Sequence, residues 1–151
     1  MKNPMLLLVE DNPNDEELTL LAIEESKVAN DVEVVRDGQE ALDFLFGEGM
    51  HAGRDTSVQP QVVLMDINLP KVNGLEVLRR IRADHRTQTL PVVMLTSSAE
   101  DRDRFAAYAS FANSYIQKPV DFDQFSIAVR QLGLYWLVLN QPPPLRDGKA
   151  A

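Results

Sequence analysis

Short apolar runs alternate with amphipathic segments along almost the whole sequence. The apolar runs predict five strands, at residues 5–9, 32–35, 61–65, 92–95 and 114–117. Between and after them, apolar residues recur at the spacing of one helical face, which predicts helices at 14–26, 38–46, 75–83, 100–109 and 122–139. Strict strand–helix alternation implies right-handed crossovers, so the pattern predicts an α/β protein with a parallel sheet covered by helices on both faces.

Polar side chains stand at the ends of four of these apolar runs. Glu10 and Asp11 follow the first run, Asp66 closes the third, Thr96 closes the fourth, and Lys118 follows the fifth. Five strand–helix units fit the flavodoxin-like (βα)5 doubly wound sheet with strand order 2-1-3-4-5. Its switch point lies between the first and third strands, at the edge where such proteins bind ligands. This topology brings Glu10, Asp11 and Asp66 together.

Three neighbouring carboxylates repel one another in a partly desolvated cleft, and either protonation or a bound cation must relieve that repulsion. Oxygen ligands favour Mg²⁺, which takes one or two protein carboxylates and keeps several waters. With the metal bound, Asp66 can act as a nucleophile and form an aspartyl phosphate. Lys118 would neutralise charge on the transferred group, and the Thr96 hydroxyl would donate to one of its oxygens. Each residue alone also has an ordinary explanation as a cap, turn or strand end, but the combination favours a site.

The chain resembles the receiver domains of two-component response regulators. The matching stretches are LVEDN at 8–12, LMDINLP at 64–70, NG at 73–74, VVMLTS at 92–97 and YIQKP at 115–119. The resemblance covers residues 5 to 139. It implies that Asp66 receives a phosphoryl group from the phosphohistidine of a sensor histidine kinase.

The same resemblance implies a role for each neighbour of Asp66. Asp11, Asp66 and the backbone carbonyl of Asn68 would ligate Mg²⁺, while Glu10, where the family often has Asp, would act through water. Lys118 would bind the phosphoryl group, and its peptide bond to Pro119 would be cis. The protein would be no enzyme beyond its own phosphorylation and slow dephosphorylation.

Phosphorylation would draw the Thr96 hydroxyl toward the phosphoryl oxygens, and the resemblance implies that Tyr115 then turns inward. The changed surface would comprise the fourth helix, the fifth strand and the fifth helix. From the residues alone, Tyr115 is a sheet-edge tyrosine with its hydroxyl in solvent.

The apolar and proline-rich sequence near the carboxyl end predicts an interface. An apolar segment at 132–139 leaves one side of the last helix without polar groups, and large exposed apolar patches mark interaction sites. We expect residues 1–139 to form the receiver domain and the proline-rich residues 140–151 to form an arm that crosses a partner in a homodimer. The alternative is that other loops of the chain cover the segment. The expected interface residues are Leu134, Tyr135, Trp136, Val138, Pro142, Pro143 and Pro144.

A narrower resemblance points to the partners. The long connection at 47–60, the motif EDNP at 10–13 and the Tyr135-Trp136 pair resemble single-domain regulators of phytochrome-type kinases. This implies a bacteriophytochrome as kinase and light as the stimulus. The output would be partner binding, feedback on the kinase, or onward transfer to a phosphotransfer protein. We expect residues 47–60 to form a mobile surface loop. We expect a solvated helix face, or at most a contribution to kinase docking, from Arg79, Arg80, Arg82 and Arg86.

Composition excludes several other classes of function. The net charge of −8 argues against nucleic acid and against anionic membranes, which both attract basic surfaces. The absence of cysteine excludes thiolate chemistry and disulfide scaffolds. No secretory signal or membrane-spanning segment is visible, so we expect the cytoplasm.

Three rival functions share parts of this pattern. A phosphatase or phosphomutase would need a second acid just after the nucleophile, and Asn68 stands two positions on. A flavodoxin-type redox protein would cradle phosphate in its first loop, where Glu10 and Asp11 would repel it. A degenerate receiver serving as a scaffold would not need Asp66, Thr96 and Lys118 together.

Overall fold

Five parallel strands form one sheet in the order β2-β1-β3-β4-β5 in the computed structural model. The strands are β1 (Met5–Val9), β2 (Asp31–Val35), β3 (Val62–Met65), β4 (Val92–Thr96) and β5 (Ser114–Gln117). The structure describes residues 5–26, 31–98, 100–118, 121–133, 135–136, 140–141 and 144. The predicted fold class and strand order are confirmed.

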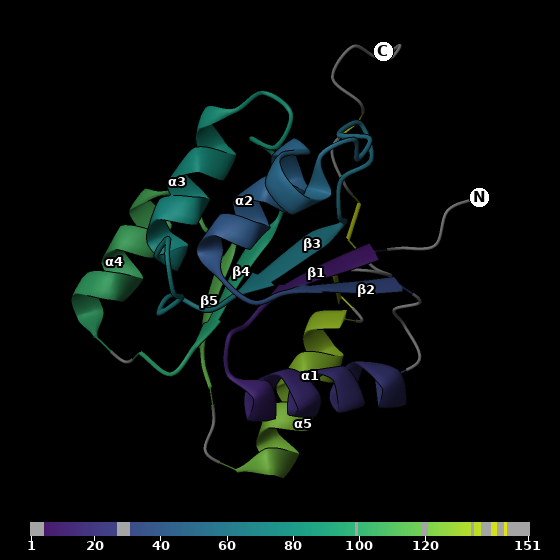
Figure 1. The fold of residues 1–151 in the computed structure, drawn as a ribbon. Helices are drawn as coiled ribbons and strands as arrows, with labels where there is room; N and C mark the ends of the chain where they lie inside the picture. Colours follow the sequence, from purple (N-terminus) through teal and green to yellow (C-terminus); the bar gives the residue numbers. More distant parts are fainter. Residues whose placement is uncertain are drawn as a thin grey trace.

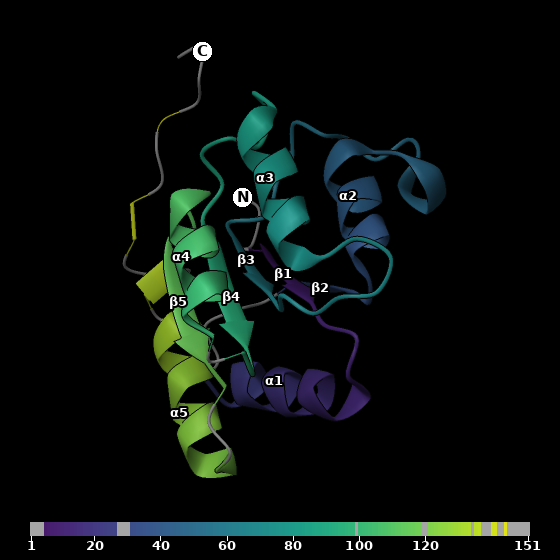
Figure 2. The ribbon, with the colours of Figure 1, turned by 90° about the vertical axis from the view of Figure 1, so that its left-hand side faces the viewer.

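Helices cover both faces of the sheet. On one face lie α1 (Pro13–Ser26) and α5 (Phe122–Gly133), and on the other lie α2 (Gly38–Phe46), α3 (Gly74–Ala83) and α4 (Asp101–Ala109). Figure 1 shows α1 and α5 below the strands, and Figure 2 shows α2 and α3 above them. None of the helices in the described ranges is long and apolar enough to cross a membrane.

Alternate side chains of each strand enter two separate hydrophobic clusters. Leu7 and Met65 belong to the cluster beneath α2, α3 and α4, which we term the upper core. Leu8 and Leu64 belong to the cluster against α1 and α5, which we term the lower core. Because β3 and β4 are buried on both faces, their continuous apolar sequence is what a central parallel strand requires.

The register of the strands aligns the residues that follow them. Val9 lies beside Met65, and Met65 lies beside Met94. The backbone N–H of Asp66 donates to the carbonyl of Val9 at 3.2 Å, and the N–H of Glu10 donates to the carbonyl of Val35 at 3.0 Å. The backbone of both carboxylate residues therefore continues the hydrogen-bond ladder of the sheet.

The described part of the last helix, α5, covers Phe122–Gly133, whereas we expected a helix to about Leu139. Tyr135 and Trp136 lie in a wider turn, in which the N–H of Asn140 donates to the carbonyl of Tyr135 at 2.6 Å. A bond across five residues is typical of a π-turn rather than an α-helix. Leu134 and residues 137–139 lie outside the described residues.

The connection between α2 and β3 has more structure than the sequence led us to expect. It contains the 3₁₀ turn η1 (Gly49–His51), and Arg54 holds it against the end of α2. The Arg54 guanidinium donates to the carbonyls of Phe44 and Val58 and lies 4.1 Å from the centre of the Phe44 ring. One half-buried arginine therefore organises a segment that its polar composition suggested was a loose loop.

The expectation that Arg82 belongs to a solvated helix face is wrong. Its guanidinium donates to the backbone carbonyls of Phe111, Gln88 and Leu90 and to the side chain of Asn113. Burial of the guanidinium lowers the pKa of Arg82 from its ordinary value. Arg82 thus fastens the end of α3 to the segments that precede β4 and β5.

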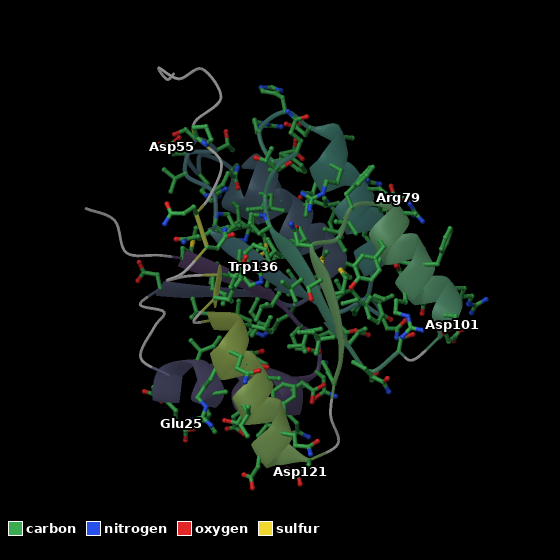
Figure 3. All side chains as sticks on the ribbon, turned by 180° about the vertical axis from the view of Figure 1, so that it is seen from behind. Glu25, Asp55, Arg79, Asp101, Asp121 and Trp136 are labelled. Carbon is green, nitrogen blue, oxygen red and sulfur yellow. The ribbon has the colours of Figure 1, made fainter. Side chains whose placement is uncertain are left out.

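Replacing Arg82 with Ala should destabilise the protein by about 2–3 kcal/mol, because the carbonyls of Phe111, Gln88 and Leu90 would lose a charged donor, the last of them in a part-buried contact. Urea unfolding measures the change. The matched control is Arg79→Ala on the same helix, because Arg79 lies at the periphery and contacts only Glu76 among the hydrogen bonds described. Figure 3 shows its position. Equal stability of the two variants would contradict the role assigned to Arg82.

Candidate functional site

Four polar residues that end strands meet at the carboxyl edge of the sheet. Glu10 follows β1, Asp66 follows β3, Thr96 ends β4, and Lys118 follows β5. Glu10 is 2% exposed, Asp66 7% and Thr96 0%. Ionisable side chains are rarely so buried unless they are paired. The structure therefore brings together these residues that the sequence analysis singled out.

The turn after β3 holds Asp66 in place. The N–H of Gly74 donates to the carbonyl of Ile67 at 2.8 Å, and Asn73 caps α3 by accepting from the N–H of Leu75 at 2.8 Å. A side chain at position 74 would collide with the backbone carbonyl of Asp66. Only glycine allows α3 to begin this close to the site.

Three carboxylates are close enough to share one cation. Oxygen atoms of Glu10, Asp11 and Asp66 all lie within 4.8 Å of one another. Opposite ligands of an octahedral Mg²⁺ ion are ~4.2 Å apart, since each lies ~2.1 Å from the metal, so a small shift or a bridging water would let the three acids share one ion. Asp11 is exposed, whereas the other two are buried. The all-oxygen set, open to solvent at Asp11, fits a small divalent ion that keeps part of its water.

The Lys118 ammonium lies at the centre of the negative charge. Its nitrogen is 2.6 Å from Glu10 Oε1, 2.7 Å from Asp15 Oδ2 and 3.2 Å from Asp66 Oδ2. Burial by itself lowers the pKa of Lys118, but the hydrogen bonds to Asp15 and Glu10 and the charge of Asp66 raise it well above its ordinary value. The lysine is therefore a permanent cation at any physiological pH.

At Glu10, burial has a larger effect than the neighbouring charge. Burial raises the pKa of Glu10, and the hydrogen bond and charge of Lys118 offset only part of that rise. Its other oxygen accepts the N–H of Asn12 at 3.2 Å. Asp66 is held in a similar way, because its Oδ1 accepts the N–H of Asn68 at 3.3 Å. Both acids are thus oriented by backbone amides as well as by the lysine.

Thr96 and Tyr115 both contact the loop that follows β4. The Thr96 hydroxyl accepts the N–H of Ser98 at 3.3 Å, and the N–H of Lys118 donates to the Thr96 carbonyl at 2.7 Å. The Tyr115 hydroxyl donates to the Ser98 carbonyl at 3.0 Å, and its ring packs against the upper core. The solvent-facing hydroxyl that the residues alone indicate is not seen.

Sequence reasoning did not single out Asp15. It lies in the first turn of α1, among several acids that all suit a helix amino end. The sequence of this turn does not indicate which of these acids lies near the end of β5. Only the packing of α1 beside the end of that strand brings Asp15 to Lys118.

The expected interface lies partly outside the described residues. Pro119 also lies outside them, so the predicted cis bond stays a prediction. Tyr135 is 50% exposed. The Trp136 ring packs against the lower core, and its carbonyl accepts from the Gln61 amide at 3.1 Å. Pro144 is exposed. Leu134, Val138, Pro142 and Pro143 are not among the described residues.

The fold and the group of acids at the carboxyl edge of its sheet suit a phosphoryl-accepting signalling domain. Residues 6–130 match the family described as the response regulator receiver domain. The chain belongs to this family, whose members act as phosphoryl acceptors in two-component signalling with histidine kinases.

Individual relatives cover almost the whole chain. The probable methanogenesis regulatory protein FilR2 of Methanothrix harundinacea (strain 6Ac) is 40% identical over 92% of this chain and 87% of its own length. The phosphorylated cyanobacterial phytochrome response regulator RcpA is 36% identical with a TM-score of 0.87, over 94% of this chain and 99% of that one. The bacteriophytochrome response regulator RtBRR is 50% identical with a TM-score of 0.75, over 95% and 86%.

Replacing Lys118 with Met should destabilise the metal-free protein by about 3 kcal/mol at neutral pH, because buried carboxylates lose their counter-charge. The pKa of Glu10, which burial raises, would rise further without Lys118. A carboxyl whose pKa is higher in the folded state costs stability as the pH rises from its unfolded to its folded pKa. The deficit should therefore shrink as the pH falls below that folded value.

Urea unfolding at a series of pH values measures this deficit. Lys71→Met is the control, because the Lys71 side chain is 68% exposed and lies 3.6 Å from Asp37. That variant should match the wild type at every pH. A Lys118→Met deficit that stays constant down to acidic pH would show that the carboxylates are not its cause.

Proposed function

We propose that Asp66 is the phosphoacceptor and that a sensor histidine kinase is the donor. The observation that carries this is the Asp66 carboxylate itself, 7% exposed and 3.2 Å from a buried ammonium. A carboxylate oxygen of Asp66 attacks the phosphorus of a phosphohistidine as the phosphorus–nitrogen bond breaks. The bonding electron pair stays on the imidazole nitrogen, which takes up a proton, and Asp66 keeps the phosphoryl group.

We further propose Mg²⁺ as the cofactor, held by Asp11 and Asp66, by Glu10 through water, and by the backbone carbonyl of Asn68. The close oxygen atoms of the three acids support this set. A related response regulator has been solved in a Mn²⁺-bound form. When bound, the ion supplies positive charge that offsets the charge on the transferring phosphoryl group.

Lys118 and Thr96 are the remaining groups that we assign to the phosphoryl oxygens. Lys118 would donate to one oxygen and Thr96 to another. Support for a switch comes from Ser98, because its N–H donates to the Thr96 hydroxyl and its carbonyl accepts from Tyr115. A shift of Thr96 toward the phosphoryl group would therefore disturb both contacts and alter the surface of α4, β5 and α5.

The names of two relatives support one class of kinase as the phosphoryl donor. RcpA and RtBRR are phytochrome response regulators, so we propose a bacteriophytochrome-type kinase, light as the stimulus and the cytoplasm as the place. FilR2 carries a different regulatory name, and a kinase panel would separate the two contexts. The phosphoryl group would alter partner binding or pass to a phosphotransfer protein.

We also propose that residues 1–139 form the receiver domain and that residues 140–151 form an arm in a homodimer. The support is a groove between β5 and α5, lined by Ser114, Ile116, Leu132 and Tyr135. Among the strands that the structure describes, β5 pairs only with β4 and forms an edge of the sheet. A partly apolar groove beside a half-exposed tyrosine suits a second copy of the chain.

Incubation with acetyl phosphate and Mg²⁺ should add the mass of one phosphoryl group, and Asp66→Asn should abolish this addition. Intact-protein mass spectrometry measures it, and a chelator should prevent it. Asp101→Asn is the control, because Asp101 is 91% exposed at the start of α4 (Figure 3). Labelling of the Asp66→Asn variant at the wild-type rate would refute the proposal, and no mass gain by the wild type would indicate a scaffold.

Light scattering should show a dimer for the whole chain and a monomer for residues 1–139. Tyr135→Glu should also weaken the dimer, because a charge would enter the partly apolar groove. Tyr108→Glu is the control, since Tyr108 on α4 is 49% exposed and Tyr135 is 50% exposed. The dimer proposal fails if the whole chain is already monomeric, or if the two tyrosine variants weaken the dimer equally.

A further inference from the structure

The ammonium of Lys118 is fully engaged by carboxylates. It has three protons and three carboxylate partners, and its contacts to Glu10 at 2.6 Å and Asp15 at 2.7 Å are shorter than its contact to Asp66 at 3.2 Å. Its side chain is 8% exposed. A phosphoryl oxygen can therefore reach this cation in the buried site only if one carboxylate gives up its place.

Asp15 differs from the other two partners of Lys118. Glu10 and Asp66 belong to the group of acids that could hold a metal, and Asp15 does not. A cation would draw oxygen atoms of Glu10 and Asp66 toward itself, which weakens their hold on the lysine. Asp15, on α1, would remain as the partner that competes with an incoming anion.

The backbone of Asp15 is fixed, while its side chain can leave the site. The N–H of Asp15 donates to the Asn12 side chain at 3.1 Å, and its carbonyl accepts the Thr19 hydroxyl at 2.7 Å. The side chain is 31% exposed, so water can solvate the carboxylate once the lysine turns away. Exchange of Asp15 for a phosphoryl oxygen thus needs no rearrangement of α1.

We propose that Asp15 competes with the phosphoryl group for the Lys118 ammonium and so limits how readily Asp66 is phosphorylated. This inference rests on the proposed phosphoacceptor function of Asp66. Asp15 acts through the lysine and does not touch the reacting atoms, so it is a positioning residue. It holds the lysine toward α1 in the unphosphorylated protein and releases it when the dianion forms on Asp66.

The experiment compares Asp15→Asn with Glu17→Gln in the whole chain. Both variants remove one negative charge from the same helix, but Glu17 is exposed and has no contact with Lys118 in the structure. Fluorine NMR follows titration with beryllofluoride, a mimic of the phosphoryl group, in the presence of Mg²⁺. Thermal unfolding confirms that both variants fold.

Asp15→Asn should bind beryllofluoride about three- to fivefold more tightly than Glu17→Gln, the gain from one lost competing ion pair that is partly exposed. Labelling by acetyl phosphate should be faster by a similar factor. Because Asn can still accept a hydrogen bond, Asp15→Ala serves as a second variant and should show at least the same gain.

Equal affinities of the Asp15 and Glu17 variants would overturn the inference, because the effect would then be one of net charge alone. Weaker binding by both Asp15 variants would also overturn it, since Asp15 would then hold Lys118 in the productive position. In either case labelling of the wild type at Asp66 would leave the proposed function standing. Labelling that persists in Asp66→Asn would instead refute that function.

Discussion

A single buried ammonium allows this sheet edge to exist in the absence of a metal. Glu10 and Asp66 approach each other where water is scarce, and their mutual repulsion would oppose folding without a counter-charge. Lys118 supplies that charge from the far strand of the sheet, within 3.2 Å of both acids. In the function that we propose, the contacts that stabilise the unphosphorylated protein therefore occupy the cation that would bind the phosphoryl group. Stability and reactivity would then depend on the same nitrogen atom.

The register of the strands sets the positions of the site residues at this edge of the sheet. Val9, Met65 and Met94 lie side by side in register, so the residues that follow β1 and β3 emerge at the same level. Thr96 lies beside Gln117, which brings Lys118 to the end of β4. A slip of one residue would turn every side chain of a strand to the other face, so the two hydrophobic cores also maintain the geometry of the site.

Sequence reasoning succeeded where a local signal has one physical meaning. Strand β3 is apolar throughout because both its faces are covered, and this made the strand and its terminal Asp66 visible. It was less successful with long side chains. We expected Arg82 on a solvated helix face, and Arg54 lies in a segment expected to be a mobile loop. Each is instead bound to backbone carbonyls. The residues next to an arginine in the sequence do not show whether its guanidinium points into solvent or folds back onto the protein. Its partners are distant in the chain.

The sequence by itself determined the class of fold, the strand order and the family, because these depend on periodicity and on short motifs that each carry their own constraint. It also indicated the acids at the strand ends, since parallel strands end at one edge. Only the tertiary structure decided that Asp15 joins Glu10 and Asp66 around Lys118, and that Tyr115 reaches the Ser98 carbonyl. Those contacts depend on how α1 packs against the sheet and on where the edge strand β5 ends. The geometry of such packing arises from the sum of many weak contacts, and no local pattern of residues encodes it.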